Sequence, residues 1–340
     1  MTTPRKLSLS SPKLRSERSL RLETLELDAP PLTERVFEFL DKDHNGTISA
    51  ADIFAEFELC GLRRDDPRIA SLCTYLAENN DVQMNYEMFQ ETTKASASII
   101  EKCFGGLLCI PMFNAFRMDV QELFNEICGK NNNKTMFAVS MCTIDGQRHD
   151  MGTQENLDEI KFCMEECCKP ILYSMAMESN SDIDEYISHE PSGLAAHTMA
   201  LQNKNGKKRP HNPLMNTGAL VSSALLLADG SSVDKIYDSF IDRLGSLFSR
   251  DQAVAENIPT KQSMEEEDYA SINKAIAYML DASHCFPNDT NIDDVMKLFF
   301  QSCATTCTVD ELSLFAATLA NGGIHPISGK RIIQPRTVHH

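Results

Sequence analysis

The sequence predicts an α+β protein in which a helical N-terminal region precedes a domain that mixes strands with long helices. Three observations predict this class. Apolar residues recur at helical spacing from Leu32 to about Ala97. A stretch with the alternation of a β-strand then runs from Thr135 to Ile144 and meets Asp145-Gly146, a strong turn signal for a β-hairpin. Helical spacing dominates again beyond the hairpin.

The N-terminal region is expected to form four short helices in two pairs. Its helical pattern breaks at residues 41–46, at Pro67 and at residues 79–81, where Gly, Pro, Asn and Asp interrupt the apolar spacing. A further helical stretch runs from about Phe113 to Cys128.

The hairpin is expected to continue into a second strand through Arg148. A two-stranded hairpin is only marginally stable alone, so further strands are required, although the sequence shows none before residue 340. The long helical stretches expected after the hairpin cover about 160–187, 216–229, 232–248, 270–282 and 291–320.

Residues 1–28 are rich in Arg, Lys and Ser and poor in acids. This composition is typical of a disordered tail, and equally of a mitochondrial transit peptide. We expect a mitochondrial location, with a cytoplasmic location as the alternative.

Net charge limits the classes of partner. A formal net charge of -17 argues against an extended nucleic-acid or anionic membrane surface, because both need clustered Lys and Arg. No stretch approaches the ~20 apolar residues of a membrane span. We therefore expect neither nucleic acid nor membrane as a partner, which leaves small molecules, cations and proteins.

The 12 cysteines are expected to be reduced thiols. No apolar signal segment is present, and the adjacent Cys167 and Cys168 are awkward for a disulfide framework. The pairs Cys163/Cys167 and Cys303/Cys307 lack the spacing and the His partners of a zinc site. Buried cysteine is the favoured interpretation.

A calcium-type loop lies between the first two expected helices. Oxygen-bearing side chains stand at the ligand positions of a 12-residue EF-hand loop, and Gly46 stands at the sixth position, where such a loop turns sharply. Val36, Phe37 and Leu40 line one face of the preceding helix, and Ile53, Phe54 and Phe57 line one face of the following helix. The candidate ligands are Asp41, Asp43, Asn45, Thr47, Ser49 and Asp52.

Asp52 occupies the twelfth position, where a bidentate Glu is usual, so we expect weak calcium binding or a preference for magnesium. The alternative is a vestigial loop held by side-chain-to-backbone turns and helix capping. The paired loop near residues 76–85 lacks ligand spacing, so any metal site is single.

Five motifs follow one another along the chain: MFAVSMCTIDGQRHDMG (136–152), CMEECCKPILY (163–173), EPSG (190–193), PHNPLMNTG (210–218) and LANGG (319–323). Together they resemble the glutaminases, and Gly61 to Arg68 is similar to the helical N-terminal region of animal glutaminases. The resemblance covers about residues 30–337.

The resemblance implies the fold of serine β-lactamases and penicillin-binding proteins, in which a Ser-x-x-Lys pair begins a buried helix. Residues three apart share a helix face, so the lysine amine can activate the serine hydroxyl. Lys169 matches this lysine, whereas Glu166 stands at the serine position. A carboxylate is a poorer nucleophile toward an amide, and beside Lys169 it favours the ammonium form, which cannot act as a base.

Other family positions match unevenly. The resemblance assigns substrate-binding roles to Asn216 and Asn273, and to Glu266 as the residue that recognises the substrate amino group. Two catalytic-type tyrosines are replaced, with Asn125 near the place of one and Phe299 at the other. Neither replacement can relay a proton as a phenol does.

These expectations combine into one architecture. Residues 1–28 form a tail, residues 29–100 an EF-hand-like four-helix bundle, and residues 101–340 an incomplete β-lactamase-like glutaminase domain whose C-terminus is missing. The family reaction is hydrolysis of L-glutamine to L-glutamate and ammonia without a catalytic cofactor, and we expect it to be impaired here. The alternative is a non-catalytic, divalent-cation-binding or regulatory subunit of an active glutaminase. Homo- or hetero-oligomers with glutaminase subunits are expected.

Overall fold

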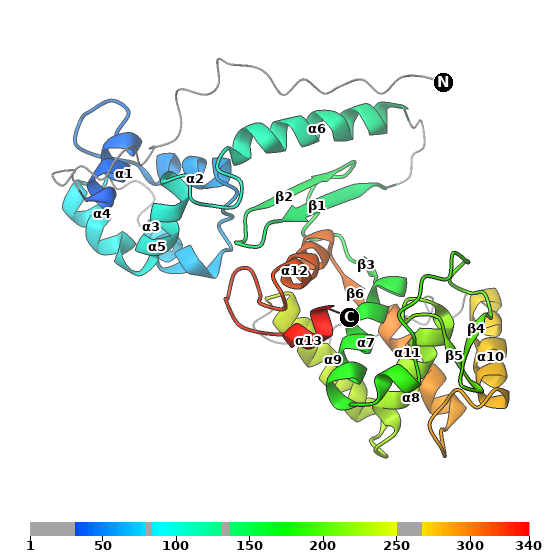
Figure 1. Cartoon of the computed structure of the whole chain (residues 1–340). Helices are drawn as coiled ribbons and strands as arrows, with labels where there is room; N and C mark the ends of the chain where they lie inside the picture. Colours follow the sequence, from blue (N-terminus) through cyan, green and yellow to red (C-terminus); the bar gives the residue numbers. More distant parts are fainter. Residues whose placement is uncertain (1–30, 79–82, 131–135, 250–266, 340) are drawn as a thin grey trace. The chain divides into compact units, whose positions relative to one another are not determined.

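The computed structural model describes residues 31–78, 83–130, 136–249 and 267–339 (Figure 1). The expected tail of residues 1–28 and the candidate Glu266 lie outside these residues. The chain divides into two compact units. The N-terminal unit comprises Met1–Asn133 and Asp145–His149, and the C-terminal unit comprises Lys134–Ile144 and Asp150–His340.

Six α-helices form the described part of the N-terminal unit. The four short helices predicted for residues 32–97 are present, and α5 follows them as an additional helix. The helices are α1 (Leu32–Leu40), α2 (Ala50–Leu59), α3 (Ala70–Glu78), α4 (Tyr86–Thr93), α5 (Ala97–Phe104) and α6 (Phe113–Lys130), with short 3-10 turns η2 (Pro67–Ile69) and η3 (Lys94–Ser96).

The two helix pairs are joined through their loops. Ile48 and Met84 exchange backbone hydrogen bonds of 2.9 Å in each direction, forming an isolated antiparallel bridge. The apolar faces predicted for the helices on either side of the calcium-type loop are buried in one core, as expected. That core contains Val36, Phe37, Leu40, Ile53, Phe54 and Phe57 together with residues of α3, α4 and α5.

The turn of the predicted hairpin belongs to the N-terminal unit. Gln147, which is 1% exposed, donates to the carbonyls of Cys60 (2.9 Å) and Ile110 (3.0 Å) and accepts from the Ile110 amide (2.8 Å). The Arg148 amide donates to the Gly61 carbonyl at 2.8 Å, and its guanidinium pairs with Asp65 at 2.7 Å. The turn is therefore held by the loops that follow α2 and α5.

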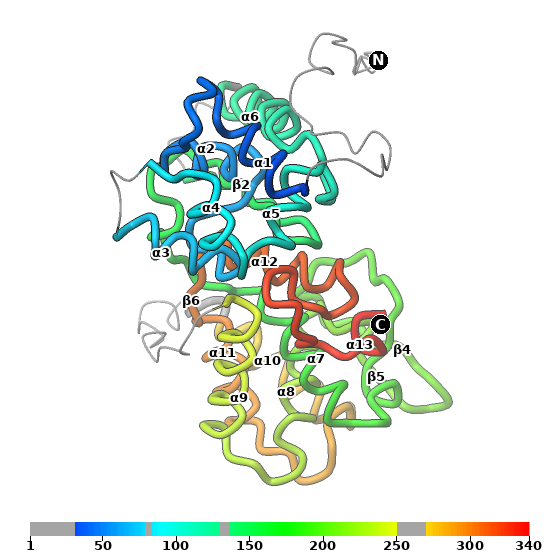
Figure 2. The backbone as a smooth tube through the Cα atoms, turned by 90° about the vertical axis from the view of Figure 1, so that its left-hand side faces the viewer, coloured from blue at the N-terminus to red at the C-terminus, as the bar shows by residue number. Residues whose placement is uncertain are grey.

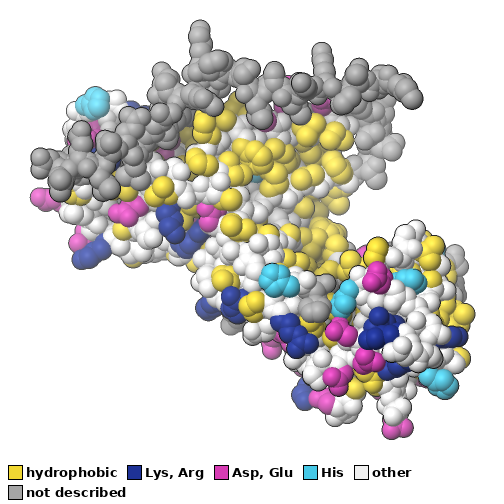
Figure 3. All heavy atoms as spheres, viewed as in Figure 1, with side chains coloured by type: hydrophobic (Ala, Val, Ile, Leu, Met, Phe, Trp, Pro, Cys, Tyr) yellow, Lys and Arg dark blue, Asp and Glu magenta, His cyan; other side chains and the backbone are white. Residues whose placement is uncertain are grey.

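Helix α6 carries apolar side chains on its exposed surface. Apolar atoms gather in the region where α6 runs (Figure 3). The exposed residues there are Phe116, Met118, Leu123 and Ile127. Concentrations of exposed apolar surface of this kind mark candidate surfaces of contact.

The C-terminal unit is built around buried helices. Helices α7 (Lys169–Ser179) and α8 (Asn216–Leu227) contact each other, and their residues contribute to a core that also includes α9 (Val233–Leu247), α10 (Glu267–Ala282) and α11 (Ile292–Ala304). These helices lie side by side in Figure 2. Helices α12 (Val309–Ala320) and α13 (Pro335–His339) complete the unit, with α12 packed against β1 (Ala138–Cys142).

Three two-stranded sheets occur in the described residues. β1 pairs with β2 (Arg148–Gly152), so the second hairpin strand begins at Arg148, whereas the sequence predicted that it would end there. The sequence indicated no further strands before residue 340, and this expectation was wrong. β3 (Phe162–Cys163) pairs with β6 (Thr306–Cys307), and β4 (Leu201–Lys204) pairs with β5 (Lys207–Pro210), both antiparallel.

Two predicted long helices are interrupted. The 160–187 stretch contains β3, the 3-10 turn η4 (Glu165–Cys168), α7 and the 3-10 turn η5 (Ile183–Glu185). The 291–320 stretch divides into α11 and α12, because Thr308 and Glu311 form a capping box that starts a new helix after β6. The predictions for 216–229, 232–248 and 270–282 correspond to α8, α9 and α10.

Candidate active site

The site begins where η4 passes into α7. The Met164 amide donates to the Thr305 carbonyl at 2.8 Å, which ties the start of the turn to the β3–β6 connection. Pro170 stands in the first turn of α7, where its missing N–H has no intrahelical partner to lose. Lys169 opens α7 and is only 1% exposed. The chain therefore places a lysine amine in the interior at a helix start.

Three acceptors surround the Lys169 amine. Its Nζ lies 2.9 Å from the Leu214 carbonyl, 2.6 Å from Asn216 Oδ1 and 2.9 Å from Glu166 Oε2. An ammonium has three N–H donors and no lone pair, so this arrangement fits the protonated form. In this arrangement Lys169 is a donor and not a base.

Two buried asparagines continue the hydrogen-bond chain. Asn216, at the start of α8, donates from Nδ2 to Asn273 Oδ1 on α10 at 2.8 Å. Its backbone amide donates to the Ala196 carbonyl at 2.9 Å. Both asparagine side chains are fully buried, whereas the Glu166 side chain is 49% exposed. The structure thus brings together four predicted residues from α7, α8, α10 and η4, with the carboxylate on the solvent side.

Gly218 explains how the segment before α8 reaches this position. A Cβ at Gly218 would lie 2.1 Å from the Asn212 carbonyl oxygen and 2.7 Å from Pro213 Cα. The close approach of this backbone places Leu214, which lies between Pro213 and the helix, where its carbonyl accepts from Lys169. The glycine of the Met-Asn-Thr-Gly segment therefore has a packing role.

The two cysteines beside Glu166 do not provide an activated nucleophile. Burial raises the pKa of the Cys168 thiol well above its ordinary value, and its Sγ lies 3.7 Å from that of Cys303 in the core. Burial also raises the pKa of Cys167, with the Glu166 charge adding to the effect. Because the thiolate is the reactive form, both environments oppose nucleophilic attack.

Comparison with known proteins identifies the family of the chain. The family model described as glutaminase matches residues 129–340, which is more than half of the chain. The chain belongs to the glutaminase family. An EF-hand domain model matches residues 32–111.

Similar proteins include the mitochondrial glutaminase liver isoform of Rattus norvegicus, 29% identical over 82% of this chain and 48% of that protein. A glutaminase of Corynebacterium glutamicum is 31% identical over 61% of this chain and 48% of that protein. The chain spans about half the length of the curated relatives it matches. A Bacillus glutaminase of known structure matches with a TM-score of 0.54 and 20% identity, covering 65% of this chain and 70% of that one. This likeness confirms the predicted α+β, β-lactamase-like fold of the glutaminase domain.

The two tyrosine positions of the glutaminase resemblance differ in their surroundings. Phe299 is fully buried in α11 and contributes to the core of the C-terminal unit. Asn125 lies on α6 of the N-terminal unit, where its Oδ1 accepts from Gln121 at 3.1 Å.

Sequence reasoning did not identify a polar chain one turn beyond Lys169. The Tyr173 hydroxyl lies 3.5 Å from His189 Nδ1, and His189 Nε2 lies 2.8 Å from Asp184 Oδ1. Burial, followed by the charge of Asp184, raises the pKa of Tyr173 to about 12. The spacing of four between Lys169 and Tyr173 was an available signal, because such residues share a helix face. The loop partners His189 and Asp184 had no comparable signal.

In the calcium-type loop, side-chain oxygens accept hydrogen bonds from N–H and O–H groups of the same loop. Asp41 accepts from the amides of Asn45 (3.0 Å) and Gly46 (2.8 Å), and Asn45 Oδ1 accepts from the Thr47 amide and hydroxyl. Burial raises the pKa of Asp41, but the amide hydrogen bonds outweigh it and hold that pKa below its ordinary value.

Ser49 caps α2 and donates from its hydroxyl to Asp52. Across the described residues no group of three His, Cys, Asp or Glu side chains converges as a metal site. The loop thus has EF-hand ligand types, while several of its side-chain oxygens already accept hydrogen bonds from the loop's own backbone and side chains. No helix in the described ranges is both long and apolar enough to cross a membrane.

Proposed function

We propose that this chain carries out the glutaminase reaction, hydrolysis of L-glutamine to L-glutamate and ammonia, and that Glu166 keeps its turnover low. The observation that carries the proposal is the buried chain Lys169–Asn216–Asn273, closed on the solvent side by Glu166. Asn216 and Asn273 bind substrate, and Glu266 recognises the substrate amino group.

Glu166 lowers turnover in two ways. Its carboxylate is a weak nucleophile toward an amide carbon, and its contact with Lys169 at 2.9 Å favours the ammonium. The family chemistry needs a hydroxyl at this position and a neutral amine beside it. Replacing the carboxylate by a hydroxyl supplies the nucleophile. It also removes the negative charge that opposes a neutral lysine amine.

The test is glutamate release from L-glutamine by the purified chain and its variants. We expect Glu166→Ser to raise turnover by about 10²-fold, the scale of one positioned acid–base partnership, and Lys169→Ala to abolish that gain. Glu159→Ser replaces an exposed acid outside the site and serves as the matched control. A folded Glu166→Ser chain that binds glutamine without turnover would favour the non-catalytic, regulatory alternative.

For the N-terminal unit, we propose weak binding of Ca²⁺ or Mg²⁺ by the loop Asp41–Asp52, without dependence of the fold on the ion. The match to an EF-hand domain model supports the site, and the internal hydrogen bonds of the loop support the independence. Calorimetric titration with either ion tests it. Saturable heat lost in Asp43→Asn is expected, and the lack of any saturable heat at about millimolar ion would contradict the proposal.

Location and assembly are separate parts of the proposal. We propose a mitochondrial location, supported by the named rat relative and by the Arg- and Ser-rich composition of residues 1–28. Imaging of fluorescent fusions with and without these residues tests it, and an unchanged cytoplasmic signal would favour the alternative. We also propose association with glutaminase subunits, which light scattering of the purified chain checks by its molar mass.

A further inference from the structure

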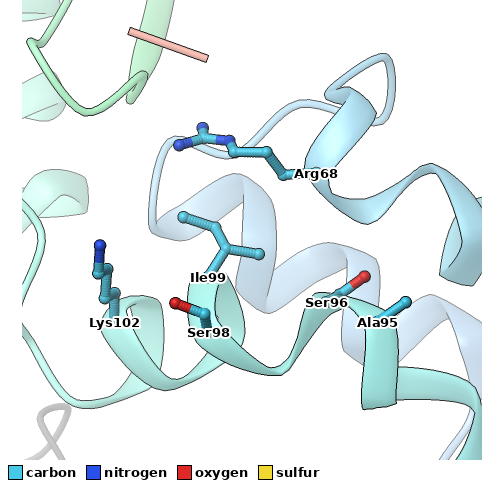
Figure 4. A pocket seen from close by; sticks show the side chains of 6 residues that line it. All are labelled: Arg68, Ala95, Ser96, Ser98, Ile99 and Lys102. Atoms are coloured by element: carbon cyan, nitrogen blue, oxygen red, sulfur yellow. The ribbon is translucent and has the colours of Figure 1, made fainter. Parts of the chain in front are cut away.

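A pocket of about 270 Å³ lies within the N-terminal unit, and no residue of the candidate active site is among its described lining residues. Its walls combine two cationic, two hydroxyl and two apolar side chains. They are Arg68, Lys102, Ser96, Ser98, Ala95 and Ile99. Figure 4 shows Arg68 reaching from η2 on one side, while the other residues come from the segment that runs through η3 into α5.

Ser96 provides an unpaired polar group in this pocket. The residue is 2% exposed, and its Oγ has no hydrogen-bond partner among the described residues. It stands at the start of α5 without making a capping hydrogen bond. A buried hydroxyl without a hydrogen-bond partner is unfavourable. A bound ligand or water that hydrogen-bonds to the hydroxyl would offset this cost.

Arg68 has donors left for a ligand. Its Nε and Nη2 bind Asp66 at 2.9 and 2.6 Å, and its Nη1 donates to the Asp145 carbonyl at 2.6 Å. A guanidinium has five N–H donors, so these three bonds leave one on each Nη. Asp66 offsets part of the charge, while Lys102 adds an exposed ammonium on the other wall.

We propose that this pocket binds a small organic anion with a carboxylate or phosphate head group. The head group lies between Arg68 and Lys102, which offer N–H donors, and the body lies over Ile99 and Ala95. A hydrogen-bonding group of the ligand meets Ser96. Its described lining contains neither an acidic nor an aromatic side chain, which opposes binding of a cation or a stacked base.

Arg68 connects this pocket to the hairpin turn. The same guanidinium that faces the pocket holds the Asp145 carbonyl, within the turn that belongs to the N-terminal unit. A bound anion restrains the guanidinium, so ligand binding stabilises this unit by mass action. Thermal unfolding of the full chain therefore reports binding without any need for catalytic activity.

The experiment measures the unfolding midpoint and the calorimetric Kd with three probes at matched ionic strength: glycerol phosphate, succinate and inorganic phosphate. We expect saturable binding of at least one organic probe with a Kd of about 1 mM, tighter than that of inorganic phosphate. The tighter organic probe identifies the head group as phosphate or carboxylate.

Variants then locate the site. Lys102→Gln is expected to weaken binding about tenfold, whereas Lys94→Gln, an equal charge change on η3 outside the pocket, leaves it unchanged. Ser96→Ala weakens binding without lowering the midpoint of the ligand-free chain, because it removes an unpaired hydroxyl. Equal effects of the two lysine variants, loss of binding only in Lys169→Ala, or no saturable binding of any probe would each overturn the proposal.

Discussion

Glu166 and Lys169 form an ion pair one turn apart, with Oε2 and Nζ separated by 2.9 Å, and they differ sharply in environment. The Lys169 side chain is 1% exposed and that of Glu166 is 49% exposed. The buried ammonium therefore depends on a carboxylate that remains partly solvated. A partly solvated partner contributes less than a buried one, because water screens the attraction.

The strength of this pair is measurable by a double-mutant cycle with Glu166→Gln and Lys169→Met. We expect a coupling energy of about 1 kcal/mol. This value is at the upper end of the range for exposed ion pairs, because one of the two partners is buried. Urea unfolding of the parent, both single variants and the double variant gives this value. A coupling of zero would mean that the Leu214 carbonyl and Asn216 alone hold the ammonium.

Gly218→Ala is expected to destabilise the chain by about 3 kcal/mol or more. A Cβ there would lie 2.1 Å from the backbone oxygen of Asn212, and backbone cannot rotate away as a side chain can. Gly129→Ala is the control, because among the described residues no atom beyond its own stretch of helix lies within 4 Å of its added Cβ, and Ala favours helix. Denaturant unfolding should show a large decrease in the free energy of unfolding for Gly218→Ala and no decrease for Gly129→Ala.

Much of this site was predictable, because Lys169, Glu166 and Asn216 occur in sequence motifs with family spacing and the resemblance also assigned Asn273. Their mutual distances were not. The third acceptor of Lys169 is the backbone carbonyl of Leu214, and every residue type carries that group. The position of this carbonyl depends on the approach permitted at Gly218, which is a tertiary effect.

The fold shows the same division between local and long-range information. Helices with apolar faces, such as α1, α2 and α9, follow from local spacing. The β4–β5 hairpin was missed although Asn205-Gly206 is a strong turn signal, because its strands are polar and lack alternation. The capping box at Thr308 and Glu311 was likewise a local signal that would have divided the 291–320 stretch.

Tyr173 is expected to make stability fall at alkaline pH. Its pKa of about 12 lies above the ordinary 10.0, because burial and then the Asp184 charge disfavour the phenolate. The folded state thus binds more protons than the unfolded state between about pH 10 and 12, and the free energy of unfolding declines across that window. Tyr173→Phe should flatten the decline, and the exposed Tyr278→Phe should not. Chemical unfolding at a series of alkaline pH values checks this, and equal slopes for both variants would contradict it.

Gln147→Ala is expected to destabilise the N-terminal unit by about 2–4 kcal/mol. The side chain is 1% exposed, and its hydrogen bonds include those to the Cys60 carbonyl and to both backbone groups of Ile110. Truncation leaves partly buried backbone groups without partners, which costs more than the bonds themselves contribute. Gln154→Ala, at an exposed position after β2, is the control and should change stability little. Hydrogen exchange of the Ile110 amide provides the local measurement: its protection should fall in Gln147→Ala, and unchanged protection would show that the amide is held by another group.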